Sequence, residues 1–159
     1  MPSVTDFDVF PQETASWCWA AASQMMLRRF LGSSIRQCEL ASSLAELMDG
    51  VKVDCCAGSG NRYCEQYGPL MVRGLRFDST GLNKYLGWEQ VKTEIDNNRP
   101  FVISSSIHYY ICTGYNDNQQ QELILWNPWP PKVGANETRT MGWYTSLNES
   151  QSYYNFRAA

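Results

Sequence analysis

The stretch of sequence that decides the fold is QETASWCWAAA at residues 12–22. From here to about residue 31 the side chains are nearly all apolar or helix-favouring, a pattern typical of a helix that is buried on most faces. Ser16 is a suitable N-cap for this helix, and Gly32 is a suitable stop. Cys18 is therefore predicted to lie in the first helical turn, where unpaired backbone amides and the helix dipole favour a thiolate over a thiol.

Cys18 and the glutamine that stands six residues before it form a candidate pair of nucleophile and oxyanion donor. The thiolate is the attacking form of a cysteine, and a nearby imidazolium would lower the thiol pKa further. The side-chain amide of Gln12 and the backbone N–H of Cys18 could both donate to the oxygen of a tetrahedral intermediate. Taken alone, Cys18 is typical of a small core residue and Gln12 of a solvated loop. Their spacing and the flanking tryptophans favour the functional interpretation.

His108 is the only histidine in the chain, so any imidazole chemistry has to use it. It opens an apolar strand pattern in which Tyr110 and Cys112 share its face. Asn127 ends the next strand pattern, where its side-chain oxygen could accept the proton on the far imidazole nitrogen. Alone, His108 would more often be structural and Asn127 an ordinary turn residue; together they predict a base and its orienting amide. Trp129 could cover their hydrogen bond or pack in the core, whereas Cys112 predicts an inert thiol.

The remaining patterns place helices first and strands later in the chain. The expected elements are helices over residues 37–48 and 88–95, a short helical piece from Ser79, and strands over residues 101–107, 108–115, 122–126 and 140–147. This order predicts an α+β fold in which the N-terminal helix carrying Cys18 packs on a C-terminal antiparallel sheet. No repeat, linker or low-complexity tract divides the sequence, so residues 1–159 are expected to form one domain.

Four of the six cysteines lie in or just before one glycine-containing polar stretch: Cys38, Cys55, Cys56 and Cys64. Four cysteines allow three pairings, and a bridge between the neighbours Cys55 and Cys56 would be strained, which leaves two. Free thiols and zinc binding are the alternatives, although there is no Cys-x-x-Cys pair and only one histidine. Disulfides are the preferred interpretation, and they would imply an extracellular, periplasmic or host-exposed place of work.

Size and charge exclude several classes of function. At 159 residues, 43% of them hydrophobic, the chain has room for a real core. The net charge of −3 argues against nucleic acid as a partner. No apolar run approaches the roughly 20 residues that span a bilayer, so no membrane partner is expected either. The first residues lack the basic and apolar regions of a signal peptide, so export would need another route or a targeting segment outside this sequence.

The residues from about Phe10 to Trp129 resemble a papain-like cysteine peptidase of compact bacterial type. The helix motif Trp-Cys-Trp-Ala-Ala is similar to that of the peptidase C39-like and C70 (avirulence-effector) groups. The clan's oxyanion glutamine, nucleophile, base and orienting residue match, in order, Gln12, Cys18, His108 and Asn127. The resemblance implies a minimal papain-like fold and a site that uses no cofactor.

Three departures from the family pattern are visible. Cys18 follows Ser-Trp rather than the Gly-Ser or Gly-Ala common in papain itself. Only ninety positions separate Cys18 from His108, so much of the loop structure of the larger enzyme must be missing. These two features favour a compact relative over papain proper. Many compact relatives carry aspartate where this chain has Asn127.

The resemblance implies an endopeptidase that hydrolyses protein or peptide substrates through a Cys18 thioester. Transpeptidation, transglutamination and glutamine deamidation pass through the same intermediate and are alternatives within this chemistry. A catalytically silent papain-like binding module is the alternative from another class, and retention of all four polar site residues argues against it. Analogy with small free-standing domains of this type suggests a secreted bacterial effector or toxin, with a cognate inhibitor or immunity protein as a candidate partner.

Overall fold

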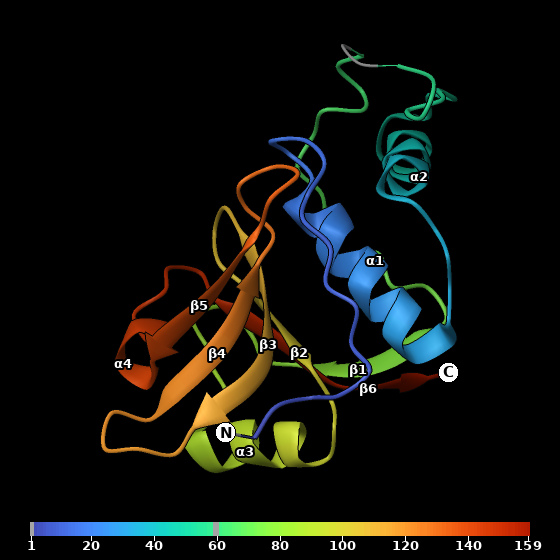
Figure 1. Cartoon of the computed structure of the whole chain (residues 1–159). Coiled ribbons are helices and arrows are strands. Elements are labelled where there is room, and N and C mark those ends of the chain that lie inside the picture. The colour runs from blue at the N-terminus through green and yellow to red at the C-terminus, as the bar shows by residue number, and fades with distance from the viewer. Residues whose placement is uncertain (1, 59–60) are drawn as a thin grey trace.

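The structure, a computed structural model, describes residues 2–58 and 61–159. Met1 lies outside the described residues, as do Ser59 and Gly60 of the predicted cysteine loop. Within the described part of the chain, four helices accompany one six-stranded sheet (Figure 1). The helices are α1 Cys18–Leu31, α2 Gln37–Asp49, α3 Trp88–Asp96 and α4 Met141–Tyr144. The strands are β1 Leu75–Ser79, β2 Phe101–Ser104, β3 Tyr109–Asn116, β4 Glu122–Asn127, β5 Ala135–Thr140 and β6 Gln151–Ala158.

The sheet is antiparallel throughout and runs in the order β1-β6-β2-β3-β4-β5. Successive side chains of a strand face opposite sides. Val102 and Ile111 therefore join the apolar cluster around α1 and α2, whereas Phe101 and Cys112, their neighbours in sequence, join the cluster around α3. Because both faces of the central strands are buried, β2 begins Phe-Val-Ile without an apolar–polar alternation.

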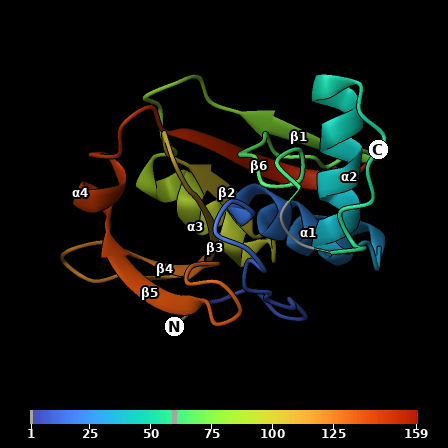
Figure 2. The same cartoon turned by 90° about the horizontal axis from the view of Figure 1, so that it is seen from above.

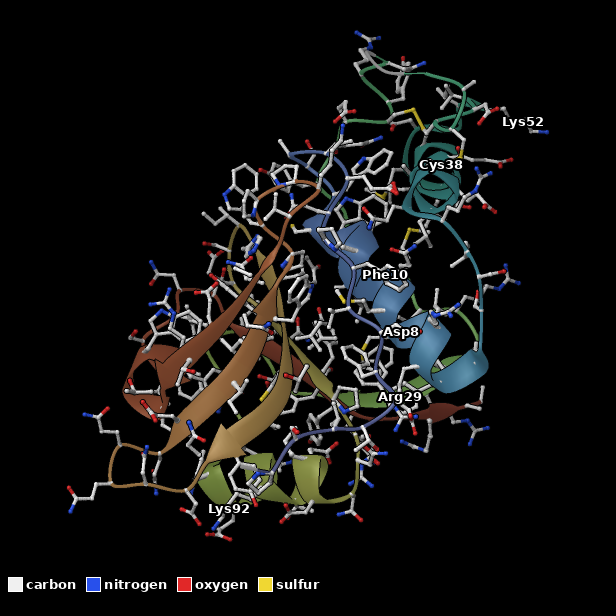
Figure 3. All side chains as sticks on the ribbon, in the orientation of Figure 1. Asp8, Phe10, Arg29, Cys38, Lys52 and Lys92 are labelled. Carbon is white, nitrogen blue, oxygen red and sulfur yellow. A yellow bond between two sulfur atoms is a disulfide. The ribbon has the colours of Figure 1, made fainter. Side chains whose placement is uncertain are left out.

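The arrangement is the α+β papain-like fold that the sequence predicts. Figures 1 and 2 show α1 and α2 side by side at one end of the molecule and α4 at the other. The N-terminal segment runs along α1, where Asp8 and Phe10 are labelled in Figure 3. There the Phe10 carbonyl accepts a hydrogen bond of 2.9 Å from Trp126 Nε1 on β4, which ties the segment to the sheet. Across residues 2–58 and 61–159, none of the helices combines the length and apolarity needed to cross a membrane.

The N-cap of helix α1 lies one residue later than predicted. Trp17, not Ser16, occupies the cap position, and no side chain caps the helix. The reason is a turn just before the helix, in which the Trp17 N–H donates to the Thr14 carbonyl at 3.3 Å, so that regular helical bonding starts only with the Trp17 carbonyl. The predicted stop is confirmed: Gly32 has the left-handed φ of 64° that favours glycine, and its N–H donates to the Arg28 carbonyl.

Several predictions of strand positions and ends are wrong. Ser79 ends β1 instead of starting a helical piece, and β1 has one buried residue followed by four exposed ones, so it carries no alternating pattern. The strand predicted within 140–147 is absent, because β5 ends at Thr140 and the Thr140 hydroxyl caps α4 by accepting from the Trp143 N–H. The predicted strand 101–107 stops at Ser104, and β6 was not foreseen.

The four clustered cysteines form two disulfides, Cys38–Cys56 and Cys55–Cys64, which is one of the two pairings that remained open. Because all four sulfurs are paired, they are not available as zinc ligands. The first bond anchors the cysteine segment to α2, at the position of Cys38 in Figure 3. Cys18 and Cys112 are free and buried.

Mass spectrometry can test this pairing. A non-reducing digest is expected to yield peptides that link Cys38 to Cys56 and Cys55 to Cys64, after cleavage of the Cys55–Cys56 peptide bond or sequential fragmentation. Thiol titration should count two free thiols in the unfolded, unreduced chain, because only Cys18 and Cys112 are unpaired. A count of six, or a Cys38–Cys55 linkage, would contradict the arrangement.

Candidate active site

One cleft of about 720 Å³ brings candidate residues from the helix and the sheet together. Cys18 lines it from the first turn of α1, beside His108, which directly precedes β3, and Asn127, which ends β4. The rest of the wall consists of small, hydroxyl-bearing, apolar and aromatic residues: Ala15, Tyr67, Gly68, Ser105, Ser106, Ile107, Tyr109, Tyr110 and Trp129. Gln12 does not line the cleft. Three of the four predicted site residues therefore meet in one place.

Cys18 is held in surroundings with opposing effects on its thiol. The residue is only 1% exposed, and this burial raises the pKa of the thiol above its ordinary value. Backbone hydrogen bonds from Trp19, Tyr109 and Cys18 itself act in the other direction and lower the pKa, but by less. Burial thus opposes the thiolate that the backbone amides at the helix start favour.

The imidazole of His108 is oriented by Asn127. His108 Nε2 lies 2.6 Å from Asn127 Oδ1, and this oxygen also accepts the Trp129 backbone N–H at 2.9 Å. An amide oxygen can only accept, so Nε2 carries the ring proton and Nδ1 is left unprotonated. Burial lowers the pKa of His108, while the bond to Asn127 and the charge of Glu137 partly raise it. Burial therefore acts against the charged form of both groups, the Cys18 thiolate and the His108 imidazolium.

Trp129 contributes to the site in a way that the sequence did not indicate. Its side chain is 46% exposed at the cleft, so it is not a core aromatic. Its backbone N–H, by contrast, helps to fix Asn127. Cys112 is buried in the core, where desolvation raises its thiol pKa, in line with the inert thiol predicted for it.

Gln12 is buried behind the loop that leads into α1. Its Nε2 donates to the carbonyls of Thr14 at 2.8 Å and Ala15 at 3.0 Å, so both amide hydrogens are used within the loop. Its backbone exchanges hydrogen bonds with the segment after Asn127, since Gln12 N–H donates to Pro128 and Lys132 N–H donates to the Gln12 carbonyl. In this arrangement Gln12 braces the loop against the end of β4. To donate to an oxyanion, its amide would have to release at least one of the two carbonyls.

The two tryptophans beside Cys18 support the opposite wall of the cleft. Trp17 Nε1 donates to the Cys64 carbonyl at 2.7 Å, and Trp19 Nε1 donates to the Gln66 carbonyl at 3.0 Å. The chain then continues directly into Tyr67 and Gly68, which line the cleft. The sequence marked these tryptophans as part of a motif, but their hydrogen bonds to a distant loop were not predictable from it.

The packing around Gly68 is close, so a side chain at this position would force its neighbours to shift. A Cβ at Gly68 would stand 2.5 Å from Leu44 Cδ2 and 3.0 Å from Trp19 Cδ2. The Gly68 carbonyl also accepts a hydrogen bond of 3.3 Å from the hydroxyl of Tyr109, which lines the same cleft. The wall is therefore fixed from α1, from α2 and from β3.

Glu137 on β5 is the polar residue near the site that the sequence analysis missed. Its carboxylate accepts a short hydrogen bond from Asn127 Nδ2 and pairs with Arg139. The strand in which it stands, Ala135–Thr140, reads Ala-Asn-Glu-Thr-Arg-Thr, a polar run without any apolar periodicity. A carboxylate in such a run resembles any solvated side chain, and only the pairing of β4 with β5 brings it behind the histidine.

A cysteine at the start of a central buried helix, in one cleft with a histidine–asparagine pair from an antiparallel sheet, is typical of the papain-like class. The chain belongs to the Peptidase_C39 like family, whose profile matches residues 4–158. This confirms the resemblance inferred from the helix motif, and it supports a cysteine peptidase. No curated protein matches the chain.

The role of the tryptophans can be tested with Trp17→Phe, which keeps an aromatic ring but removes the donor to the Cys64 carbonyl. Loss of this buried bond should cost about 1–3 kcal/mol of stability, and kcat/KM should fall because the adjoining cleft wall loosens. Trp88→Phe is the matched control, since the Trp88 indole donates to Asp117 on the far side of the sheet. Trp88→Phe should lower stability without lowering kcat/KM; equal activity losses in both variants would contradict the assignment.

Proposed function

We propose that the protein is a cysteine endopeptidase in which Cys18 is the nucleophile, His108 the base and Asn127 the residue that orients the base. The observation that carries this proposal is the 2.6 Å contact between His108 Nε2 and Asn127 Oδ1 in the cleft that Cys18 also lines. It occupies one ring nitrogen and leaves Nδ1 free to take the proton of the thiol. Membership of a peptidase family supports the same conclusion.

The proposed reaction starts from a neutral Cys18 thiol and a neutral His108 imidazole. As Cys18 Sγ attacks the carbonyl carbon of a peptide bond, its proton passes to His108 Nδ1, and the carbonyl oxygen becomes an oxyanion. The backbone N–H of Cys18 at the start of α1 is one donor for this oxygen, and the Gln12 amide is the predicted second one once it turns from its loop. The imidazolium then protonates the leaving amine, the C–N bond breaks, and a thioester remains on Cys18.

Hydrolysis of the thioester completes the cycle. His108 Nδ1 takes a proton from a water molecule, whose oxygen attacks the thioester carbon. The C–S bond breaks, the sulfur regains its proton from the imidazolium, and the carboxylic acid product leaves. The imidazolium exists only between these steps, so groups that stabilise it, namely the Asn127 oxygen and the charge of Glu137, act on the transition states more than on the resting enzyme.

The disulfides support a proposal about where the protein is located. Two disulfides close the cysteine segment, and such bonds persist in oxidising surroundings. We therefore propose that the protein is secreted or delivered outside the producing cell. A role as a bacterial effector or toxin, restrained by a cognate inhibitor or immunity protein, is the hypothesis that fits a small free-standing peptidase of this kind, and it rests on analogy.

Cys18→Ala is the direct test of the nucleophile. The variant should lose peptidase activity by at least about a thousandfold while keeping its thermal unfolding midpoint, because a small side chain is replaced by a smaller one. An epoxide inhibitor of thiol peptidases should label the parent protein once per chain, at Cys18. Cys112→Ser is the control, and it should be labelled and remain active, since Cys112 is buried away from the cleft.

A second experiment with the Cys18→Ala variant separates the proposed function from its alternatives. A survey of cleavage sites across a proteome, with Cys18→Ala as the background, should reveal new peptide ends that depend on Cys18. Ammonia release without such ends would indicate glutamine deamidation, and amine incorporation would indicate transglutamination. Absence of both labelling and turnover would indicate a silent binding module and would overturn the proposal.

The pH dependence follows from the directions of the two pKa shifts. Because burial lowers the pKa of His108, its neutral, proton-accepting form persists below the ordinary imidazole value of about 6.5. The acid limb of kcat/KM should therefore lie below that value. Because burial raises the pKa of Cys18, alkylation by neutral iodoacetamide should keep accelerating as the pH rises above neutrality. Fast alkylation that stays constant down to a pH of about 4, as a preformed ion pair would give, would contradict the uncharged resting pair.

A further inference from the structure

Every polar atom of the Asn127 side chain is engaged. Oδ1 accepts from His108 Nε2 at 2.6 Å and from the Trp129 N–H at 2.9 Å. Nδ2 donates to Glu137 Oε2. An asparagine amide can otherwise be turned over with little change in shape, since its oxygen and nitrogen have similar size. In the turned orientation Nδ2 would face His108, so Nε2 would have to accept and the ring proton would move to Nδ1, the nitrogen proposed to receive the thiol proton.

We propose that Glu137 is a positioning residue that locks Asn127 in the orientation required by His108, and so selects the imidazole tautomer in which Nδ1 is the base. A carboxylate can only accept a hydrogen bond, so the group that faces it must be the Asn127 NH₂. The oxygen then points toward His108, where the Trp129 N–H also binds it. The inference rests on the proposed function for its catalytic meaning, but the tautomer itself is a property of the folded protein and does not depend on turnover.

The pairing of β4 with β5 builds this contact. Asn127 is the register partner of Ala135, and Leu125 is the partner of Glu137. Residues two apart in a strand share a face, so Asn127 and Glu137 are diagonal neighbours on the same face of the sheet, at a separation that long side chains span. The Glu137 side chain is only 17% exposed, which places its hydrogen bond at the protected edge of the site.

A closed circuit of contacts holds the carboxylate in place. Arg139 Nε and Nη2 both bond to Glu137 Oε1, at 3.0 and 2.6 Å, which reserves Oε2 for Asn127. The Arg139 guanidinium lies 5.2 Å from the ring centre of Trp143, which stacks edge-on with Tyr110 at 5.3 Å. The Tyr110 ring in turn meets the His108 ring edge-on at 4.8 Å. The circuit that begins at the imidazole therefore returns to it.

The circuit also sets the charges around the imidazole. The titratable groups that share the cleft with His108 are the Cys18 thiol on α1 and the tyrosines Tyr67, Tyr109 and Tyr110, and the Glu137–Arg139 pair on β5 lies behind Asn127. Of these, Glu137 stabilises an imidazolium directly, because its negative charge raises the pKa of His108. Removing the carboxylate should therefore have two effects that can be measured apart, on the tautomer and on the pKa.

Nitrogen-15 NMR of the imidazole tests the inference, because the single histidine of the chain gives one unambiguous pair of ring signals. The experiment uses the Cys18→Ala protein, so it is independent of peptidase activity. The parent should show the Nε2–H tautomer at neutral pH. Glu137→Ala should shift the ring signals toward the Nδ1–H tautomer and move the titration midpoint of His108 to lower pH.

Glu137→Gln and Glu122→Gln complete the test. Glu137→Gln is isosteric and removes the charge, so it should lower the His108 midpoint even if Glu137→Ala fails to fold. Glu122→Gln is the matched control at the other end of β4 and should change neither the tautomer nor the midpoint. In the active protein, Glu137→Gln should reduce kcat by roughly tenfold to a hundredfold with little change in KM.

Unchanged ring signals and an unchanged midpoint in both folded Glu137 variants would overturn the inference, whatever the activity. Normal NMR behaviour of the parent with no peptidase activity would instead count against the proposed function alone. A loss of kcat in Glu137→Gln without any NMR change would also overturn the positioning role, since the residue would then act on something other than the histidine.

Discussion

Burial of the first turn of α1 is the constraint on which the rest of the structure depends. It places Cys18 at 1% exposure while its sulfur still borders a cleft. Burial by itself produces an inert cysteine, as Cys112 illustrates: its thiol is desolvated and donates only to the Gly114 carbonyl. Around Cys18, by contrast, backbone amides converge on the sulfur and His108 lines the same cleft. What distinguishes Cys18, the proposed nucleophile, from the core residue Cys112 is the set of donors around its sulfur and the histidine in its cleft, not the degree of burial.

The two walls of the cleft owe their rigidity to different forces. The wall made by His108 and Asn127 belongs to a sheet whose central strands are buried on both faces, so the core fixes it. The wall at residues 66–68 has no regular secondary structure. It is held by the Cys55–Cys64 disulfide and by the indole hydrogen bonds of Trp17 and Trp19, which satisfy carbonyls that the loop cannot pair internally. The residues beside Cys18 thus hold the segment that brings Tyr67 and Gly68 to the cleft.

How much could be predicted from the sequence depended on whether the relevant pattern was local. Helices α1 to α3 and strands β2 to β4 carry apolar periodicity or buried apolar runs, and these predictions hold apart from element ends. Strands β1 and β5 are largely exposed or polar, so they lack such a pattern. In the site, Cys18 and His108 stood out by residue type and context. The contact of Asn127 with Glu137 depends on the register of β4 with β5. The bonds of the Gln12 amide within its own loop depend on the conformation of its side chain. Neither feature is visible in a single sequence.

In the proposed mechanism, the arrangement behind His108 also avoids an electrostatic cost at a partly buried base. A carboxylate in direct contact with the imidazole would be an unpaired buried charge in the free protein, which is costly. Here a neutral amide makes the contact, and the charge stands one side chain further out, where Arg139 pairs with it and solvent partly reaches it. The Asn127 amide fixes the orientation of the hydrogen bond to the imidazole. The Glu137 charge acts over a longer distance and is needed only when the imidazolium forms. In the proposed mechanism, Asn127 therefore orients the imidazole and Glu137 stabilises its charge, and the two residues lie at different depths.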